Sequence, residues 1–257
     1  MNYIRRILFR LLGVKNYLKV ISTFFFFLYD LRFLKGKPQF DCHYFVKQLI
    51  REGDVVIDLG ANVGYYSRIF AKLVKGSGRI YSIEPVKLFR AILEKNTNQY
   101  QQVEILPYAI GEKDGQDIKM GVPHSTKYFS HGKTHIVENE NENLSMTFTV
   151  KMKKPDNLFK NLERLDYLKC DIEGYEGIAI PLFDTLLKKF HPILQIELSP
   201  KNRPKLFDYL QGMGYVIFNV KGGKLSEVFS QNDLIEGDII FIHSEKIDQV
   251  KRLITEG

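Results

Sequence analysis

Cysteine is scarce in this chain, and its scarcity excludes two kinds of stabilisation. Among 257 residues there are only two cysteines, Cys42 and Cys170. A single pair cannot build a disulfide framework, and the two lack the close spacing of zinc ligands. We therefore predict a protein of a reducing compartment. Cys170 falls in a predicted buried strand, where a cysteine usually packs as a small apolar side chain.

Long hydrophobic runs are also missing. The most apolar stretch, residues 20–29, has ten residues, whereas a membrane-spanning helix needs about 20. Asp30 and Arg32 follow it at once, and no small-residue cleavage site comes after it, so the pattern does not predict a signal peptide. The sequence shows no internal repeat.

Beyond the N-terminus the chain has no excess of either charge. The formal net charge is +7, and residues 1–37 contain eight of the 37 basic side chains but one of the 30 acidic ones. The rest of the chain therefore carries 29 groups of each sign, which argues against nucleic-acid binding. The basic residues of the N-terminal segment are Arg5, Arg6, Arg10, Lys15, Lys19, Arg32, Lys35 and Lys37.

This basic N-terminal segment is also amphipathic. A cluster of four phenylalanines occupies 24–27, and one face of a predicted helix carries Ile4, Ile7, Leu8 and Leu11. Such a segment either lies in the interface of an anionic membrane or packs on the protein's own domain or on a partner subunit. Amphipathicity alone does not choose between these apolar partners.

Strand and helix patterns alternate through most of the chain. Buried strands are predicted at 55–57, 79–83, 103–110, 167–170 and 193–198, and helices at 40–51, from 65 onward, and at 87–98, 178–190 and 203–213. Two further strands, at 215–220 and 238–243, flank a Gly222-Gly223 turn and predict an antiparallel hairpin. The sequence thus predicts an α/β fold with a doubly wound, mostly parallel, seven-stranded sheet over residues 39–257 and a helical extension over 1–38.

The central stretch interrupts this alternation. A turn is predicted at 113–117 and a strand at 146–152, with a long polar loop from His124 to Ser145 between them. Loops of this length are usually functional or mobile.

The first strand ends in the pattern Asp58-x-Gly60-x-Asn62-x-Gly64, and a helix follows directly. Glycines suit this turn because its backbone angles oppose a side chain and because a cofactor approaches the main chain closely. The second strand ends in Glu84, twenty positions beyond Gly64. An acid at that distance typically accepts hydrogen bonds from a ribose diol, so the pattern predicts an adenosine-binding site.

The acidic start of this turn indicates which adenosine cofactor binds. A dinucleotide site has crowded glycines and a helix N-terminus that receives a pyrophosphate. Here Asp58 would repel a phosphate but suits the sulfonium and amino groups of S-adenosylmethionine. We therefore predict S-adenosylmethionine rather than a nicotinamide cofactor.

Four blocks of the sequence form an ordered pattern: Asp58-Leu-Gly-Ala-Asn-Val-Gly-Tyr-Tyr-Ser67, Glu84-Pro85, Lys169-Cys-Asp-Ile-Glu-Gly-Tyr-Glu176 and Ile196-Glu197. Together they resemble the FkbM-type family of S-adenosylmethionine-dependent methyltransferases. The resemblance covers about residues 40–220. It implies cofactor contacts from Asp58, Gly60, Ala61, Asn62, Gly64, Tyr65, Glu84, Pro85, Ala109 and Asp171.

The chain departs from that family's pattern in one segment. A T-L-D-x-L element usually precedes the acidic block, whereas residues 154–158 read Lys-Pro-Asp-Asn-Leu. The Asp and Leu are retained and the preceding pair is not.

Carboxylates at the ends of two late strands are candidates for the chemistry. A sugar hydroxyl becomes a good nucleophile only when a base or a metal ion takes up its proton. Asp171 and Glu173 are candidates for that base or for ligands of a divalent metal ion, and Glu197 is a third candidate near the acceptor. In the alternative, Asp171 only holds the methionine moiety and Glu173 caps the next helix.

Other polar residues of this region have weaker functional interpretations. We expect Glu176 on a helix surface, and Lys169 as an edge residue whose stem is buried or as the partner of a nearby acid. His124, His131 and His135 on the long loop are alternative bases, although a lone histidine is more often solvated than catalytic.

The sequence as a whole predicts an S-adenosylmethionine-dependent O-methyltransferase. The resemblance implies that the acceptor is a sugar hydroxyl of a glycan or glycolipid precursor. From the basic N-terminal segment, we expect the enzyme at the cytoplasmic face of a membrane. Two alternatives are methyl transfer to a small secondary metabolite and a non-catalytic scaffold that keeps the fold. No nucleic-acid partner is expected.

Overall fold

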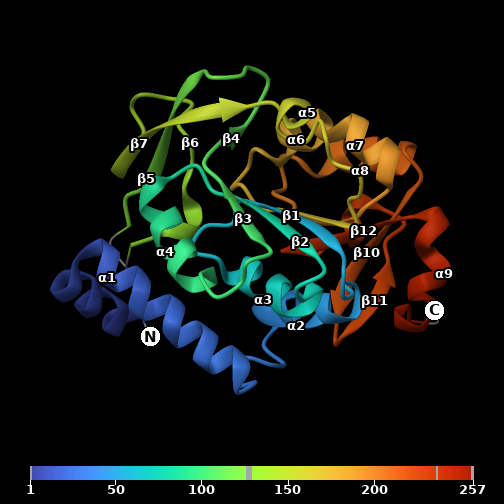
Figure 1. Cartoon of the computed structure of the whole chain (residues 1–257), viewed down its shortest axis with the longest axis horizontal. Coiled ribbons are helices and arrows are strands. Elements are labelled where there is room, and N and C mark those ends of the chain that lie inside the picture. Colours follow the sequence, from blue (N-terminus) through green and yellow to red (C-terminus); the bar gives the residue numbers. More distant parts are fainter. Residues whose placement is uncertain (1, 126–128, 236, 256–257) are drawn as a thin grey trace.

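The structure is a computed structural model that describes residues 2–125, 129–235 and 237–255, with side chains from Arg5 onward. The side chain of Ile4 and residues 126–128 of the predicted long loop lie outside the described residues. Figure 1 shows a twisted central sheet with helices on both faces and a smaller sheet beside it.

The central sheet has eight strands in the order β11-β10-β12-β9-β8-β1-β2-β3. Its parallel part is formed by β1 (Val55–Leu59), β2 (Arg79–Ile83), β3 (Val103–Leu106), β8 (Tyr167–Cys170) and β9 (Ile193–Glu197). The chain runs outward from β1 to β3 and then returns to build β8 on the other side of β1. Ligands bind at such a switch point, beyond the carboxyl ends of the strands. The predicted doubly wound, mostly parallel α/β fold is confirmed.

The antiparallel edge differs in detail from the predicted hairpin. The Gly222-Gly223 turn joins β10 (Tyr215–Lys221) to β11 (Lys224–Glu227), an eighth strand that the sequence did not indicate because it is short and polar. The other predicted partner, β12 (Asp238–His243), lies on the opposite side of β10 and pairs antiparallel with both β10 and β9. The first residue of β12 therefore lies at the edge where the parallel strands end.

Helices cover the two faces of this sheet with separate apolar clusters. One face packs against α2 (Asp41–Phe45), α3 (Tyr65–Val74) and α9 (Ile247–Val250), and the other against α6 (Glu176–Ala179), α7 (Asp184–Phe190) and α8 (Arg203–Gly212). The predicted helix at 178–190 is broken by a 3₁₀ turn, Ile180–Phe183, because Pro181 lacks the amide hydrogen that a continuous helix needs. The predicted helix at 40–51 is shorter, since 3₁₀ turns flank α2.

The central stretch forms a second sheet rather than a long loop. Its strands are β4 (Ala109–Ile110), β7 (Leu144–Lys153), β5 (Asp117–Pro123) and β6 (His135–Ile136), in that order. The strand predicted at 103–110 is therefore two strands. Pro107 and Tyr108 separate β3 from β4, and β4 leaves the central sheet to pair with β7.

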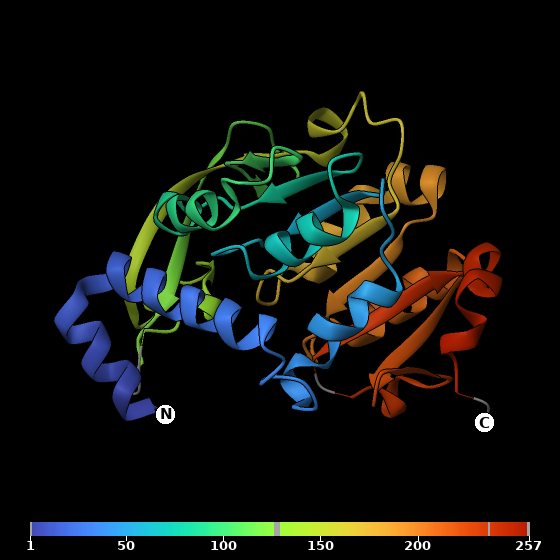
Figure 2. The same ribbon diagram turned by 60° about the horizontal axis from the view of Figure 1, so that its bottom comes forward.

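The N-terminal segment forms one long helix, α1 (Asn2–Asp30), with a kink at Gly13. It packs on α4 (Lys87–Thr97), and Tyr17, Leu18 and Ile21 are buried in one cluster with Phe89. Figure 2 shows α1 running along α4 and the second sheet. By length and composition, the part from Arg5 to Asp30 is sufficient to cross a membrane, which is weak evidence because a core helix of a globular protein passes the same test.

Candidate active site

A cavity of about 1440 Å³ lies at the carboxyl ends of β1, β2, β8 and β9. The glycine turn between β1 and α3 forms its floor. Gly60 has φ +83°, and a Cβ atom at this position would lie 1.8 Å from the carbonyl oxygen of Asp171. The turn is held by the amides of Gly60 and Ala61, which both donate to the carbonyl of Ile83 in β2 at 3.1 and 3.0 Å. Glycine is thus required by both backbone angle and space.

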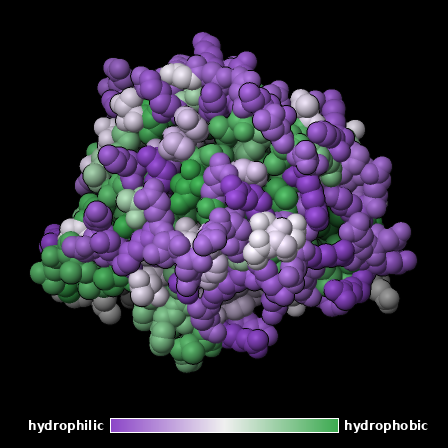
Figure 3. Space-filling view, viewed as in Figure 1, coloured by the Kyte–Doolittle hydropathy of each residue, from purple (hydrophilic) through white to green (hydrophobic). Residues whose placement is uncertain are grey.

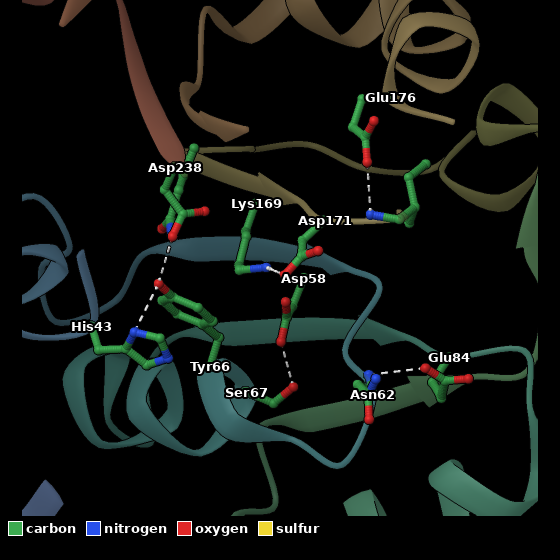
Figure 4. Close-up of polar contacts among 12 residues, drawn as sticks. His43, Asp58, Asn62, Tyr66, Ser67, Glu84, Lys169, Asp171, Glu176 and Asp238 are labelled. Atoms are coloured by element: carbon green, nitrogen blue, oxygen red, sulfur yellow. Dashed lines mark hydrogen bonds and ion pairs between the residues drawn. The ribbon is translucent and has the colours of Figure 1, made fainter. Parts of the chain in front are cut away.

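Glu84 links the end of β2 to the same turn (Figure 4). Its carboxylate accepts the amide hydrogen of Asn62 at 2.9 Å on one oxygen and that of Val86 at 2.7 Å on the other. Burial raises the pKa of Glu84 to about 7, although these two amides act in the opposite direction. Each oxygen retains a second lone pair, so the carboxylate can also accept two hydroxyl groups from the cavity.

Asp58 has one satisfied and one unsatisfied oxygen. Ser67 donates to Oδ2 at 2.6 Å, while Oδ1 is buried and has no hydrogen-bond partner in the described part of the chain. Burial raises the pKa of Asp58, and the ammonium group of Lys169 partly offsets this. Buried polar atoms are nearly always paired, so an orphaned carboxylate oxygen in a cavity wall indicates a place for a cationic or hydrogen-bond-donating ligand.

Three carboxylates converge on the cavity from separate strand ends. Asp171 and Glu173 follow β8, Glu197 ends β9, and one oxygen from each lies within 4.8 Å of the others. The sequence predicted all three as catalytic candidates, and the structure brings them together. Lys169 lies beneath them, fully buried, with its ammonium nitrogen 2.9 Å from Asp171. Lys169 is therefore the partner of an acid, and its interpretation as an edge residue is wrong.

Asp171 and Glu197 are hydrogen-bonded to each other and share one proton at neutral pH. Burial acts to raise the pKa of Asp171, but Lys169 and the hydrogen bond from Glu197 hold it below its usual range. The negative charge of Asp171, followed by burial, raises the pKa of Glu197 to about 9. The proton therefore resides on Glu197 and the charge on Asp171.

Glu173 differs from Asp171, which contacts Lys169, because no ion pair of Glu173 is found among the described residues. It has φ +54°, a left-handed conformation that is uncommon for a residue with a side chain. Glu173 is exposed on part of its surface, and its partial desolvation in the cavity, followed by repulsion from Asp171 and Glu176, raises its pKa to about 7. A carboxylate with a pKa near the working pH suits proton abstraction.

Comparison with known families shows the family to which the chain belongs. A model of the methyltransferase FkbM domain matches residues 58–217, which is more than half of the sequence. The chain belongs to the FkbM methyltransferase family. A search of curated proteins finds no match.

Among solved structures, a FkbM methyltransferase from Methylobacillus flagellatus KT is 17% identical with a TM-score of 0.48, and the match covers 73% of this chain but 43% of that one. A putative rRNA methylase from Clostridium thermocellum is 12% identical with a TM-score of 0.48, and the match covers 84% of this chain and 95% of that one. Fibrillarin from Aeropyrum pernix, with bound S-adenosyl-L-methionine, is 11% identical with a TM-score of 0.45. That match covers 76% of this chain and 68% of the fibrillarin chain.

The other cofactor positions implied by the FkbM pattern mostly reach the cavity. Its lining includes Ala61, Asn62, Tyr65, Pro85 and Ala109. Gly64 lies behind the lining, at φ +88°, where a Cβ atom would be 2.7 Å from the Leu93 side chain. Its role in the structure is close packing of α3 on α4, and a cofactor contact from it stays a prediction.

Two other segments of the FkbM pattern take unexpected positions. Glu176 is buried rather than on a helix surface, because its carboxylate accepts the amides of Ile172 and Gly174 at 3.1 and 3.0 Å and so fixes the turn after β8. The divergent residues 154–158 include α5 (Pro155–Leu158) and lie outside the cavity lining. The amide of Lys154 and the side chain of Asn157 both donate hydrogen bonds to Asp114.

The three loop histidines have different environments. His131 lines the cavity but is buried, and its Nδ1 lies 3.0 Å from the side-chain oxygen of Asn62. Burial lowers its pKa to about 4, so it is neutral near pH 7. His135 pairs with Glu142 at 2.6 Å, and His124 is exposed; neither lines the cavity.

Three polar residues beside Lys169 were not among the predicted site residues: Tyr66, Asp238 and His43. Tyr66 donates to Asp238 at 3.0 Å and lies 3.2 Å from Nδ1 of His43, whose ring stacks on Tyr66 (Figure 4). Lys169 sits over the Tyr66 ring at 4.6 Å. The position of Asp238 could have been predicted, because an acid at the start of an antiparallel strand lies at the carboxyl edge of its parallel neighbours. No sequence pattern indicated that His43 would lie here.

Proposed function

We propose that this chain is an S-adenosylmethionine-dependent O-methyltransferase that acts on a sugar hydroxyl of a glycan or glycolipid precursor. One observation carries the proposal. The glycine turn with Glu84 and the three converging carboxylates share a single cavity. Membership of the FkbM family supports methyl transfer. When bound, S-adenosylmethionine supplies the electrophilic methyl group.

We assign the donor side of the cavity to the ends of β1 and β2. Glu84 receives the ribose hydroxyls on its remaining lone pairs, and Gly60 allows the ligand to approach the main chain. The unpaired oxygen of Asp58 faces the positively charged part of the ligand. These residues fit the cofactor because they offer acceptors and negative charge and no phosphate-binding cluster of amides.

We assign the acceptor side to the carboxylates after β8 and β9. Glu173 takes the proton from the acceptor hydroxyl, since its pKa of about 7 leaves much of it charged at neutral pH. Asp171 stays charged beside Lys169, and protonated Glu197 can donate a hydrogen bond. If a divalent metal ion takes part, Asp171, Glu173 and Glu197 would hold it, and it would lower the pKa of the hydroxyl.

The proposed activity is tested by donor binding and acceptor scanning. Calorimetry should show saturable binding of S-adenosylmethionine and none of a nicotinamide cofactor. Labelled donor should then transfer methyl to a hydroxyl within a panel of glycans, glycolipid precursors and small metabolites. Absence of donor binding would support the scaffold alternative, and transfer to non-sugar metabolites alone would contradict the sugar acceptor.

Donor affinity should depend on pH through Glu84. Hydrogen bonds from ribose hydroxyls favour the charged carboxylate, so a proton must leave Glu84 when the donor binds. Affinity should therefore be constant above about pH 7 and should weaken below it, approaching tenfold per pH unit. Glu84→Gln should remove this dependence and weaken binding at least tenfold at pH 8.

The control for Glu84 is Glu94→Gln, an exposed acid on the neighbouring α4. It should keep both the affinity and the pH profile of the natural chain. Isothermal titration from pH 5.5 to 8.5 measures both. If the donor affinity of Glu84→Gln still depended on pH, another group would be responsible for the titration, and Glu84 would not bind the ribose.

We further propose that the protein binds peripherally to the cytoplasmic face of a membrane. Residues 1–37 carry the whole net charge, and Phe24, Phe27 and Phe33 are exposed. Each basic residue near an anionic surface contributes about 1 kcal/mol, and apolar side chains add a part that salt does not screen. Two buried, unpaired cysteines agree with a reducing compartment.

Charge removal in the extension should weaken membrane binding. The variant Arg32→Gln/Lys35→Gln should reduce partition to anionic vesicles by about 30-fold at low salt, since two contributions of about 1 kcal/mol are lost. The matched variant Lys113→Gln/Lys160→Gln removes two exposed charges elsewhere and should change little. Co-sedimentation with anionic and neutral vesicles gives the partition. Equal loss in both variants would mean that net charge, rather than the extension, binds the membrane.

A further inference from the structure

Helix α1 carries apolar side chains both on the face that packs on the domain and on a neighbouring face. Tyr17, Leu18 and Ile21 are buried against the domain. Val20, Phe24, Phe27 and the following residue Leu31 are spaced by four, three and four positions, so they form one stripe, about a quarter turn round the helix from the buried face. They are between 42% and 58% exposed. We call these four residues the apolar stripe.

A helix whose apolar side chains extend beyond the face that packs on its own domain has apolar surface left for a second apolar partner. Figure 3 shows apolar surface at the lower left and bottom of the molecule, where Figure 1 places α1. Of the large apolar side chains that are exposed in the described residues, seven lie between Ile7 and Phe33 and three elsewhere. The exposure is therefore concentrated on α1 and the turn after it.

The apolar stripe borders the candidate active site. The cavity that contains Asp171 and Glu173 is also lined by Val20, Phe24 and Leu28 of α1. Its volume of about 1440 Å³ exceeds the range of roughly 300–1,000 Å³ usual for small-ligand sites. The cavity can therefore hold the methyl donor and an acceptor with a sizeable apolar part.

Charge beside the apolar stripe indicates what lies against it. Lys19, Arg32, Lys35 and Lys37 lie within the same segment, and Lys37 also lines the cavity. Asp30, the single acid of the segment, is bonded to Lys72 at 2.6 Å and Arg68 at 3.2 Å. These four basic residues form no ion pair within the described part of the chain. Exposed phenylalanines among such residues fit the interface of an anionic membrane.

From this arrangement we infer that the acceptor is amphiphilic: a lipid-linked sugar whose apolar chain lies along Val20, Phe24 and Leu28 while its hydroxyl reaches Glu173. The inference rests on the proposed methyltransferase function and names its substrate class. Helix α1 then serves both as the membrane-facing surface and as the wall of the acceptor site. The sugar enters the cavity while the chain remains in an apolar environment, which avoids the cost of exposing the chain to water.

The experiment compares ligands that share a sugar and differ in chain length. Methyl, hexyl and octyl β-glucopyranosides, below their micellar concentrations, are titrated into the full chain with S-adenosylhomocysteine present. Each added methylene should tighten binding by up to about fourfold. Phe24→Ser and Leu28→Ser should weaken this dependence. Phe229→Ser, which changes an exposed phenylalanine outside the cavity lining, should retain it.

The outcomes separate this inference from the proposed function. Donor affinity, measured in the same variants, shows whether the cofactor site is intact. Intact donor binding without chain-length dependence would overturn the amphiphilic acceptor and leave the methyltransferase assignment standing. Absent donor binding in the natural chain would overturn the assignment itself. A dimer in sedimentation experiments that Phe24→Ser dissociates would make the apolar stripe a subunit interface and also overturn the inference.

Discussion

Replacing Gly60 by alanine should lower the free energy of unfolding by about 3 kcal/mol or more and abolish measurable donor binding. The left-handed backbone at φ +83° costs an alanine about 1–2 kcal/mol, and overpacking adds about 1–3 kcal/mol. The overpacking is severe here because the new Cβ atom would lie 1.8 Å from the backbone oxygen of Asp171. The end of β8 must move, and the carboxylates after it move with it. Thermal and denaturant unfolding, with donor calorimetry, measure both effects.

Two other glycines separate the causes. Gly115 has a similar φ of +75° but open space around its Cβ position, so Gly115→Ala should show the backbone cost alone. Gly76 has neither a positive φ nor a neighbour within 4 Å, and Gly76→Ala should leave stability unchanged or slightly higher. If Gly60→Ala were no more damaging than Gly115→Ala, the contact with Asp171 would not constrain the turn.

The parallel core could be predicted from sequence because its signals are local. Strands buried on both faces appear as apolar runs, and predicted strand 55–57 lies within β1, which is buried from Val56 to Leu59. The second sheet could not be predicted in the same way. Strand β5 begins Asp117-Ile-Lys-Met, a weak alternation, and β4 has two residues. Both pair with β7, which lies 21 to 34 residues beyond its partners in β5 and 43 beyond those in β4. Such long-range pairing leaves no local pattern.

The carboxylates were predictable for a different reason. Acids that end parallel strands must meet at one edge of the sheet, so Asp171 and Glu197 converge although 26 residues separate them. Their protonation could not be predicted, because it depends on the buried Lys169 nearby. The contribution of α1 to the cavity was also beyond prediction, since amphipathicity does not reveal what a helix packs against.

Glu173→Gln should lower turnover by about 10²–10⁴-fold while donor affinity stays within about twofold. This range is usual when a general base is removed. In the natural chain, the pKa of about 7 predicts a rate that rises with pH and reaches half its plateau near pH 7, since only the charged carboxylate accepts a proton. In Glu173→Gln, the remaining rate should no longer rise with pH around pH 7. Glu140→Gln, an exposed acid on the loop that follows β6, is the control and should keep both rate and profile.

Chelation distinguishes the two ways in which these carboxylates can act. If they hold a divalent cation, dialysis against a chelator should abolish activity, and magnesium or manganese should restore it. In that case Asp171→Asn and Glu197→Gln should weaken metal activation as much as Glu173→Gln, because each removes one ligand. If Glu173 acts alone as the base, chelators should have no effect, and Glu197→Gln should remain active because Glu197 already carries a proton at neutral pH. Full activity in Glu173→Gln would exclude it from either role.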